Sequence, residues 1–93
     1  MSIKVNIPMY FRRYTNGLDV AEVNGTTVGE CLNDLVKQFP DLAPVLFYAP
    51  DDLDDCIAIG IHQEVFTAWQ EPLKKLVGDG EEFAILLFGI AGG

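Results

Sequence analysis

A continuous apolar run, Phe83-Ala84-Ile85-Leu86-Leu87-Phe88, limits most strongly what this chain can fold into. A short run of this kind, bounded by turn-forming residues, is typical of a buried strand. Alternate residues of a strand point to opposite faces, so both faces of this strand are apolar. Such a strand belongs inside a sheet, and we expect apolar surface to stay exposed wherever nothing covers the second face.

The strand leads into a segment poor in side chains, Ile90-Ala91-Gly92-Gly93. Glycine has no Cβ, so a diglycine can enter a channel that is too narrow for other residues. Residues 89–93, fully extended, reach roughly 17 Å. One interpretation is a flexible tail that delivers the Gly93 carboxylate into the active site of another protein. The other is an ordinary frayed terminus. Position and composition alone leave both open.

The segment from Thr27 to Phe39 predicts the one main helix. Thr27-Val28-Gly29-Glu30 has the form of a capping box, in which the Thr27 hydroxyl and the Glu30 carboxylate bond the first backbone amides. Pro40 ends the helix near Phe39. Apolar residues recur at helical spacing and form one stripe: Val28, Cys31, Leu32, Leu35, Val36 and Phe39.

The first part of the chain predicts two strands. Apolar and polar residues alternate from about residue 3 to 11, which indicates a half-buried strand. Pro8 lacks an N–H donor and marks an edge or a bulge in it. Asn16-Gly17 is a hairpin signal, and residues 18–23 are the returning strand. The inward positions of the first strand are Ile3, Val5, Ile7 and Met9.

The remaining elements complete an α+β arrangement. We expect an irregular excursion at 41–55, strands at 57–61, 63–66 and 83–88, and a helical turn at 72–77. A strand pair, one helix and further strands predict a mixed sheet with one main helix across one face, in a single domain spanning 1–93. An alternative is that the 41–55 excursion folds over the second face of the sheet and covers its apolar surface.

Charge and hydropathy exclude several classes of function. The formal charge is −8, with 14 acidic against 6 basic residues, so the chain is not expected to bind nucleic acid. The run at 83–88 is far too short to span a bilayer. The first residues do not resemble a signal peptide, so we expect a cytoplasmic protein without a membrane partner.

The side chains that could carry chemistry favour structural roles. Cys31 and Cys56 are expected to be reduced and largely buried, because no export signal accompanies them. His62 is the sole histidine and cannot build a zinc site alone, so we expect a plain surface or edge-strand residue. The acidic run 51–55 lacks the spacing of a calcium loop. Trp69 could anchor an interface, although partial burial against the core is the more common arrangement. No catalytic or metal-binding residue is predicted.

The chain resembles the MoaD/ThiS family of ubiquitin-like sulfur carrier proteins. The resemblance covers essentially the whole chain and depends on four stretches taken together. They are the opening strand Ile3-Lys4-Val5-Asn6-Ile7-Pro8, the helix start Gly25-Thr26-Thr27-Val28-Gly29-Glu30, the turn Gly80-Glu81-Glu82-Phe83 and the terminal Ile90-Ala91-Gly92-Gly93. The resemblance implies a β-grasp fold, with the first and last strands parallel at the centre of the sheet.

The resemblance also implies a function without catalysis by the chain itself. An E1-like partner enzyme would use ATP to adenylate the Gly93 carboxylate, and sulfur transfer would leave a thiocarboxylate for a sulfur-accepting biosynthetic enzyme. The acceptor would make cysteine or homocysteine, molybdopterin or the thiazole of thiamine. No cofactor would be bound. The alternative is a ubiquitin-like interaction module whose terminus is never activated. The residues implied are Gly93 as the reacting group, Ala91 and Gly92 in the partner's channel, and Leu86, Phe88 and Ile90 in docking.

Overall fold

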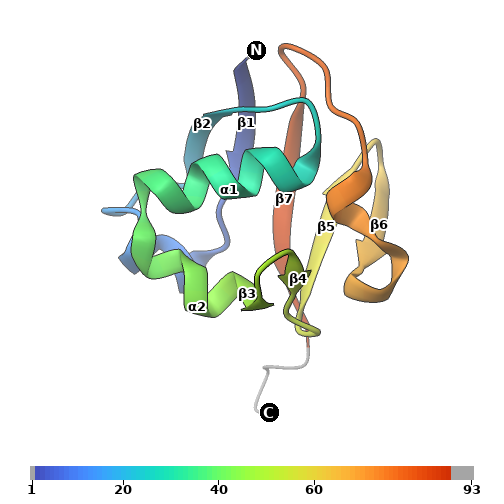
Figure 1. The fold of residues 1–93 in the computed structure, drawn as a ribbon. Coiled ribbons are helices and arrows are strands. Elements are labelled where there is room, and N and C mark those ends of the chain that lie inside the picture. Colours follow the sequence, from blue (N-terminus) through green and yellow to red (C-terminus); the bar gives the residue numbers. More distant parts are fainter. Residues whose placement is uncertain (1, 89–93) are drawn as a thin grey trace.

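A computed structural model describes residues 2–88, which form a five-stranded mixed sheet with a helix across one face (Figure 1). The strand order is β2-β1-β7-β5-β6, with β1 and β7 paired in parallel and the other neighbours antiparallel. This confirms the predicted mixed sheet with a parallel central pair. The strands are β1 (Ser2–Asn6), β2 (Val20–Asn24), β5 (Ile57–Ile61), β6 (Glu64–Thr67) and β7 (Glu82–Leu87).

The main helix is α1 (Val28–Gln38), and its start and buried face agree with the sequence. The Thr27 Oγ1 accepts a hydrogen bond from the Glu30 amide at 3.1 Å. The Glu30 carboxylate bonds one residue earlier than a capping box requires, because it accepts from both the amide and the hydroxyl of Thr26 at 2.8 Å. These bonds favour the charged carboxylate and lower the pKa of Glu30. The buried positions of the helix are Val28, Cys31, Leu32 and Leu35.

The first strand is shorter than the alternation predicted. It ends at Asn6, and a 3₁₀ helix, η1 (Met9–Tyr14), begins directly after Pro8. Pro8 cannot donate to a neighbouring strand, so pairing stops before it. Met9, predicted to face inward, is 75% exposed, and Phe11 of η1 enters the core instead.

The connection from β1 to β2 is a long one and not a two-residue hairpin. Asn16 and Gly17 do have positive φ, 56° and 84°, as the hairpin signal required. They form a turn within this connection, whose two ends are joined by the bond from the Ile7 amide to the Asp19 carbonyl at 2.8 Å. The local turn was therefore predicted correctly, and its place between the strands was not.

The excursion after α1 packs on the helix side of the sheet. It consists of η2 (Pro40–Leu42), α2 (Ala43–Leu46) and the small hairpin of β3 (Phe47–Ala49) and β4 (Asp52–Leu53). Leu42, Leu46 and Leu53 are buried in the same core as α1. Figure 1 shows α2 and this hairpin on the same side of the sheet as α1. The alternative in which the excursion covers the second face is therefore wrong.

Two side chains are more exposed than the sequence suggested. Cys56 is exposed because it lies in the turn before β5, where its amide donates to Asp54 Oδ1 at 2.9 Å. Trp69 is 75% exposed on η3 (Ala68–Gln70), a turn held by the bond from the Thr67 amide to Gln70 Oε1 at 2.8 Å. The predicted burial of both was wrong. The helical turn predicted at 72–77 is η4 (Pro72–Lys74).

Candidate docking surface at the end of β7

The end of β7 is fixed to the strand beside it. The Phe88 amide donates a 2.7 Å hydrogen bond to the Cys56 carbonyl, and Leu87 pairs with Ile57 in the sheet. The Phe88 side chain is 43% exposed. The structure therefore holds the backbone firmly up to Phe88. The other predicted positions, Ile90, Ala91, Gly92 and Gly93, lie outside the described residues 2–88.

The parallel pairing of β1 and β7 brings the segment after β1 to the end of β7. Residues 6–10 and 84–87 line a cleft of about 470 Å³ there. Met9 and Tyr10, both at least two-thirds exposed, belong to this lining. Predominantly apolar clefts of this size are typical binding sites. Sequence reasoning missed Met9 and Tyr10 because it continued the first strand through them; Pro8 was the signal that could have separated them.

Leu86 lies on the sheet face that α1 does not cover. It pairs with Ala58, while the neighbouring Ala84 pairs with Gly60. A Cβ built on Gly60 would lie 3.3 Å from the Leu86 Cδ1, so the missing side chain of Gly60 leaves room for Leu86 to lie across β5. Exposed apolar surface near the end of β7 was expected from the sequence, and the 43% exposed Phe88 together with the apolar cleft confirms it.

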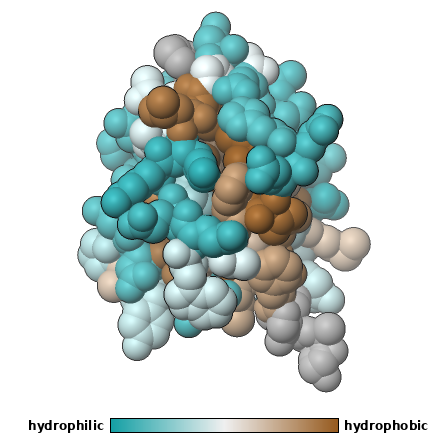
Figure 2. Space-filling model, turned by 90° about the vertical axis from the view of Figure 1, so that its right-hand side faces the viewer, coloured by the Kyte–Doolittle hydropathy of each residue, from teal (hydrophilic) through white to brown (hydrophobic). Residues whose placement is uncertain are grey.

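Hydrophobic residues continue toward the β6 edge. Figure 2 views this edge, with hydrophobic residues at the upper left, near the centre and to the lower right of it, among hydrophilic residues. Val65 of β6 is 51% exposed. An apolar patch with a polar surround is typical of a surface that contacts another protein.

Side chains cap backbone groups at both edges of the sheet. On β2, the Gln38 side chain donates to the Glu22 carbonyl at 2.9 Å, and Asp34 accepts from the Asn24 amide at 3.0 Å. On β6, Gln70 accepts from the Thr67 amide. A partner strand would have to displace these contacts before it could extend the sheet. The geometry therefore favours docking on the uncovered face and in the cleft.

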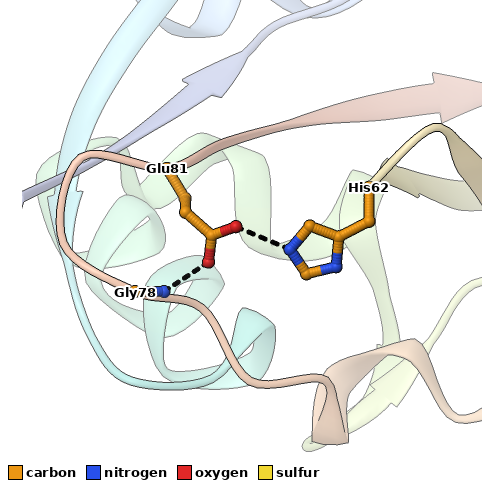
Figure 3. A network of polar contacts seen from close by, with 3 residues as sticks. All are labelled: His62, Gly78 and Glu81. Carbon is orange, nitrogen blue, oxygen red and sulfur yellow. Dashed lines mark hydrogen bonds and ion pairs between the residues drawn. The ribbon is translucent and has the colours of Figure 1, made fainter.

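His62 and Glu81 form a polar link at the opposite end of β7 (Figure 3). The His62 Nε2 lies 2.6 Å from Glu81 Oε2, and Glu81 Oε1 accepts from the Gly78 amide at 2.6 Å. The bond from Gly78, followed by that from His62, lowers the pKa of Glu81. His62 is about half exposed, as predicted for a surface residue. The link joins the β5–β6 turn to the start of β7 and is structural.

The buried Cys31 thiol lies on the inner face of α1. Burial, followed by the nearby charges of Glu30 and Asp34, raises the pKa of the Cys31 thiol to about 11, so this thiol stays protonated at neutral pH. Among residues 2–88, no cluster of three or more His, Cys, Asp or Glu side chains could hold a metal ion. No helix in the described part of the chain has the length and hydrophobicity to cross a bilayer.

Solved structures of known proteins share this fold. No family model and no curated protein sequence matches the chain. The CysO of the BexX/CysO complex from Amycolatopsis orientalis is 26% identical, with a TM-score of 0.81 over 98% of this chain and 99% of that one. The small archaeal modifier protein 1 (SAMP1) of Methanosarcina acetivorans is also 26% identical, with a TM-score of 0.79 over 99% of this chain and 96% of that one.

A third structure, SAMP1 of Haloferax volcanii, is 23% identical and has a TM-score of 0.81 over the full length of both chains. These neighbours are ubiquitin-like sulfur carriers of the MoaD/ThiS type. They confirm the β-grasp fold and the resemblance that the sequence indicated. They are also small carrier proteins and not catalysts, and one of them was solved in complex with a partner protein.

Proposed function

We propose that this chain is a sulfur carrier whose Gly93 carboxylate is adenylated by an E1-like enzyme and converted to a thiocarboxylate. The observation that supports it most directly is the full-length structural likeness to CysO and SAMP1, combined with the Ala91-Gly92-Gly93 sequence after β7. The carrier itself supplies no acid, base or metal. Its part is to present a carboxylate on a narrow segment that begins at a firmly held Phe88.

The chemistry requires two displacements. A Gly93 carboxylate oxygen attacks the α-phosphate of ATP, pyrophosphate leaves, and an acyl-adenylate forms. Hydrosulfide then attacks the acyl carbon, and AMP leaves with the C–O bonding electrons. The product is a thiocarboxylate. A carboxylate is a poor electrophile, and adenylation supplies the leaving group that it lacks. We assign both steps to the partner's active site, in the cytoplasm.

Docking would use the surface described above. Leu86, Phe88 and the cleft beside Met9 and Tyr10 form an apolar platform at the end of β7. The formal charge of −8 favours a partner with a basic surface, since opposite charge steers encounter. Ile90 would extend this platform, and Ala91 and Gly92 would pass through the channel. The acceptor enzyme would make cysteine, homocysteine, molybdopterin or thiazole.

Intact mass spectrometry tests the proposal. The protein is incubated with ATP, sulfide and its cognate activating enzyme, and the expected result is the mass gain of one oxygen replaced by sulfur at Gly93. A variant extended beyond Gly93 by one uncleaved alanine is the control and should gain nothing. An unchanged mass for the natural chain would favour the alternative, an interaction module whose terminus is not activated.

The likeness to small archaeal modifier proteins supports a second candidate function. In it, the same acyl-adenylate leads to attack by a lysine amine of a target protein, and Gly93 becomes part of an isopeptide bond. Protein conjugates that appear with ATP and the activating enzyme, and disappear for the alanine-extended variant, would identify this route. A thiocarboxylate without conjugates would identify the carrier.

A further inference from the structure

A second apolar groove lies on the helix side of the molecule, away from the proposed tail platform. It has a volume of about 420 Å³ and is bounded by α1, α2 and the β3–β4 hairpin, which lie side by side in Figure 1. Its lining is Asn33, Val36, Ala43, Pro44, Phe47 and residues 49–51. None of these residues lines the cleft beside β7. The groove is therefore a separate surface.

The groove is built into the fold. Val36 and Phe47 are half-buried and pack against the core, so the floor continues the hydrophobic interior. The hairpin is fixed by the pairing of Phe47 with the buried Leu53 and by the bond from the Asp54 amide to the Leu46 carbonyl at 2.9 Å. The rim at Pro44 and Pro50 has restricted backbone freedom. Binding here would require little ordering of the protein.

The charge around the groove selects its occupant. Asp51 is the charged residue in the lining, and the exposed Asp52 follows it. The side chain of Asn33 adds an amide that can bond a peptide backbone. An apolar lining that includes one carboxylate matches a segment that carries apolar side chains beside lysine or arginine. An acidic segment would be repelled.

We propose that this groove binds a basic, apolar peptide segment of a partner protein. Apolar side chains of the segment contact Val36 and Phe47, and a cation meets Asp51. The proposal goes beyond the carrier function and does not depend on activation at Gly93. Because the two surfaces share no lining residue, a partner held here would leave the cleft beside β7 open to an activating or accepting enzyme.

The test uses a fluorescein-labelled peptide of sequence GKLRFLKG and the full-length protein. Fluorescence anisotropy should show saturable binding, and amide shifts in NMR spectra of the labelled protein should fall on residues 33–37 and 43–51. The same peptide with glutamate at its basic positions should bind far more weakly. Failure of the basic peptide to bind, equal binding of the acidic one, or shifts confined to the uncovered sheet face would overturn the proposal.

Three variants test which residues of the groove contribute to peptide binding. Ala49→Arg places a bulky cation in the groove and should weaken binding at least about tenfold, since each tenfold corresponds to 1.4 kcal/mol. Asp51→Asn removes the charge and keeps a residue that tolerates the positive φ of 59° at this position. It should weaken binding about threefold, as expected for an exposed ion pair. Asp55→Asn makes the same charge change outside the groove and should bind normally.

Thiocarboxylation of Gly93 provides the independent readout. Ala49→Arg should be thiocarboxylated at the natural rate, and saturating peptide should not slow that reaction. Loss of peptide binding with normal thiocarboxylation supports two separate surfaces. Inhibition of thiocarboxylation by the peptide would contradict them, whereas a chain that is never thiocarboxylated but binds the peptide would contradict only the carrier function.

Discussion

The Phe88 amide donates to the Cys56 carbonyl at 2.7 Å, and this bond fixes the backbone just past the end of β7. It joins the last described residue to the turn before β5. Because the bond involves only backbone atoms, it holds the Phe88 backbone without requiring any particular residue at 56. The exposed Phe88 side chain therefore starts from a fixed backbone position, directly after the strand whose residues 84–87 line the cleft.

Truncating Phe88 should impair docking and leave the fold intact. Phe88→Ala removes an exposed aromatic ring, and we expect kcat/KM for thiocarboxylation to fall about tenfold, the loss of a contact slightly above 1 kcal/mol. The measurement is the initial rate with the activating enzyme at limiting carrier. Leu18→Ala is the matched control, because Leu18 is 44% exposed against 43% for Phe88 but lies in the β1–β2 connection. Equal rates for the two variants would remove Phe88 from the docking surface.

Adding one methyl group at Gly25 should destabilise the protein. A Cβ there would lie 2.8 Å from the Cys31 amide nitrogen and 3.0 Å from the Cys31 Sγ, so the start of α1 would have to move. Overpacking of this kind costs about 1–3 kcal/mol, which Gly25→Ala should show as a lower free energy of unfolding in urea. At Gly78 the nearest contact of a built Cβ is 3.4 Å, and Gly78→Ala should change stability by less than about 0.5 kcal/mol. Similar losses for both variants would contradict the packing argument.

The two cysteines should differ sharply in reactivity. Cys31 is fully buried with its pKa raised to about 11, whereas Cys56 is exposed. Iodoacetamide at neutral pH should therefore alkylate Cys56 and leave Cys31 unmodified until the protein is denatured, as peptide mass mapping would show. Cys56→Ser should take up no label in the folded state. Rapid labelling of Cys31 in the native protein would mean that the core opens readily.

The sequence predicted local structure well because the signals for it are local. The helix follows from Thr27 and an apolar stripe, and the central position of β7 follows from a strand that is apolar on both faces. The strand end at Asn6 was missed because Met9 continued the alternation past Pro8. Tertiary placement was harder to predict. No pattern near Cys56 indicates that its carbonyl meets Phe88, and the acidic hairpin gives no sign of which sheet face it covers.

The residues of the candidate docking surface also differ in how far the sequence alone could identify them. Leu86 and Phe88 could be identified because they belong to the apolar run 83–88 that precedes the diglycine in the sequence. Met9 and Tyr10 join them through the parallel pairing of β1 and β7, which connects residues far apart in the chain. The contact between His62 and Glu81 could not be predicted for a similar reason, because the two residues are 19 positions apart in the chain and meet only when the sheet forms.

The link between His62 and Glu81 predicts a pH-dependent contribution to stability. The pKa of Glu81 is lowered in the folded protein, chiefly by the Gly78 amide, so the folded state binds a proton at Glu81 less readily than the unfolded state. Its contribution is therefore present above the unfolded pKa of about 4.3 and is lost as pH falls through the lower folded value. Glu81→Ala should lower Tm at pH 7, and the difference from the natural protein should shrink below about pH 4.

Glu82→Ala is the control. The Glu82 carboxylate accepts a hydrogen bond from the Asn6 side-chain amide, so its removal should change Tm less at pH 7. A Tm difference for Glu81→Ala that persists undiminished in acid would show that packing, and not the charged carboxylate, stabilises this end of β7.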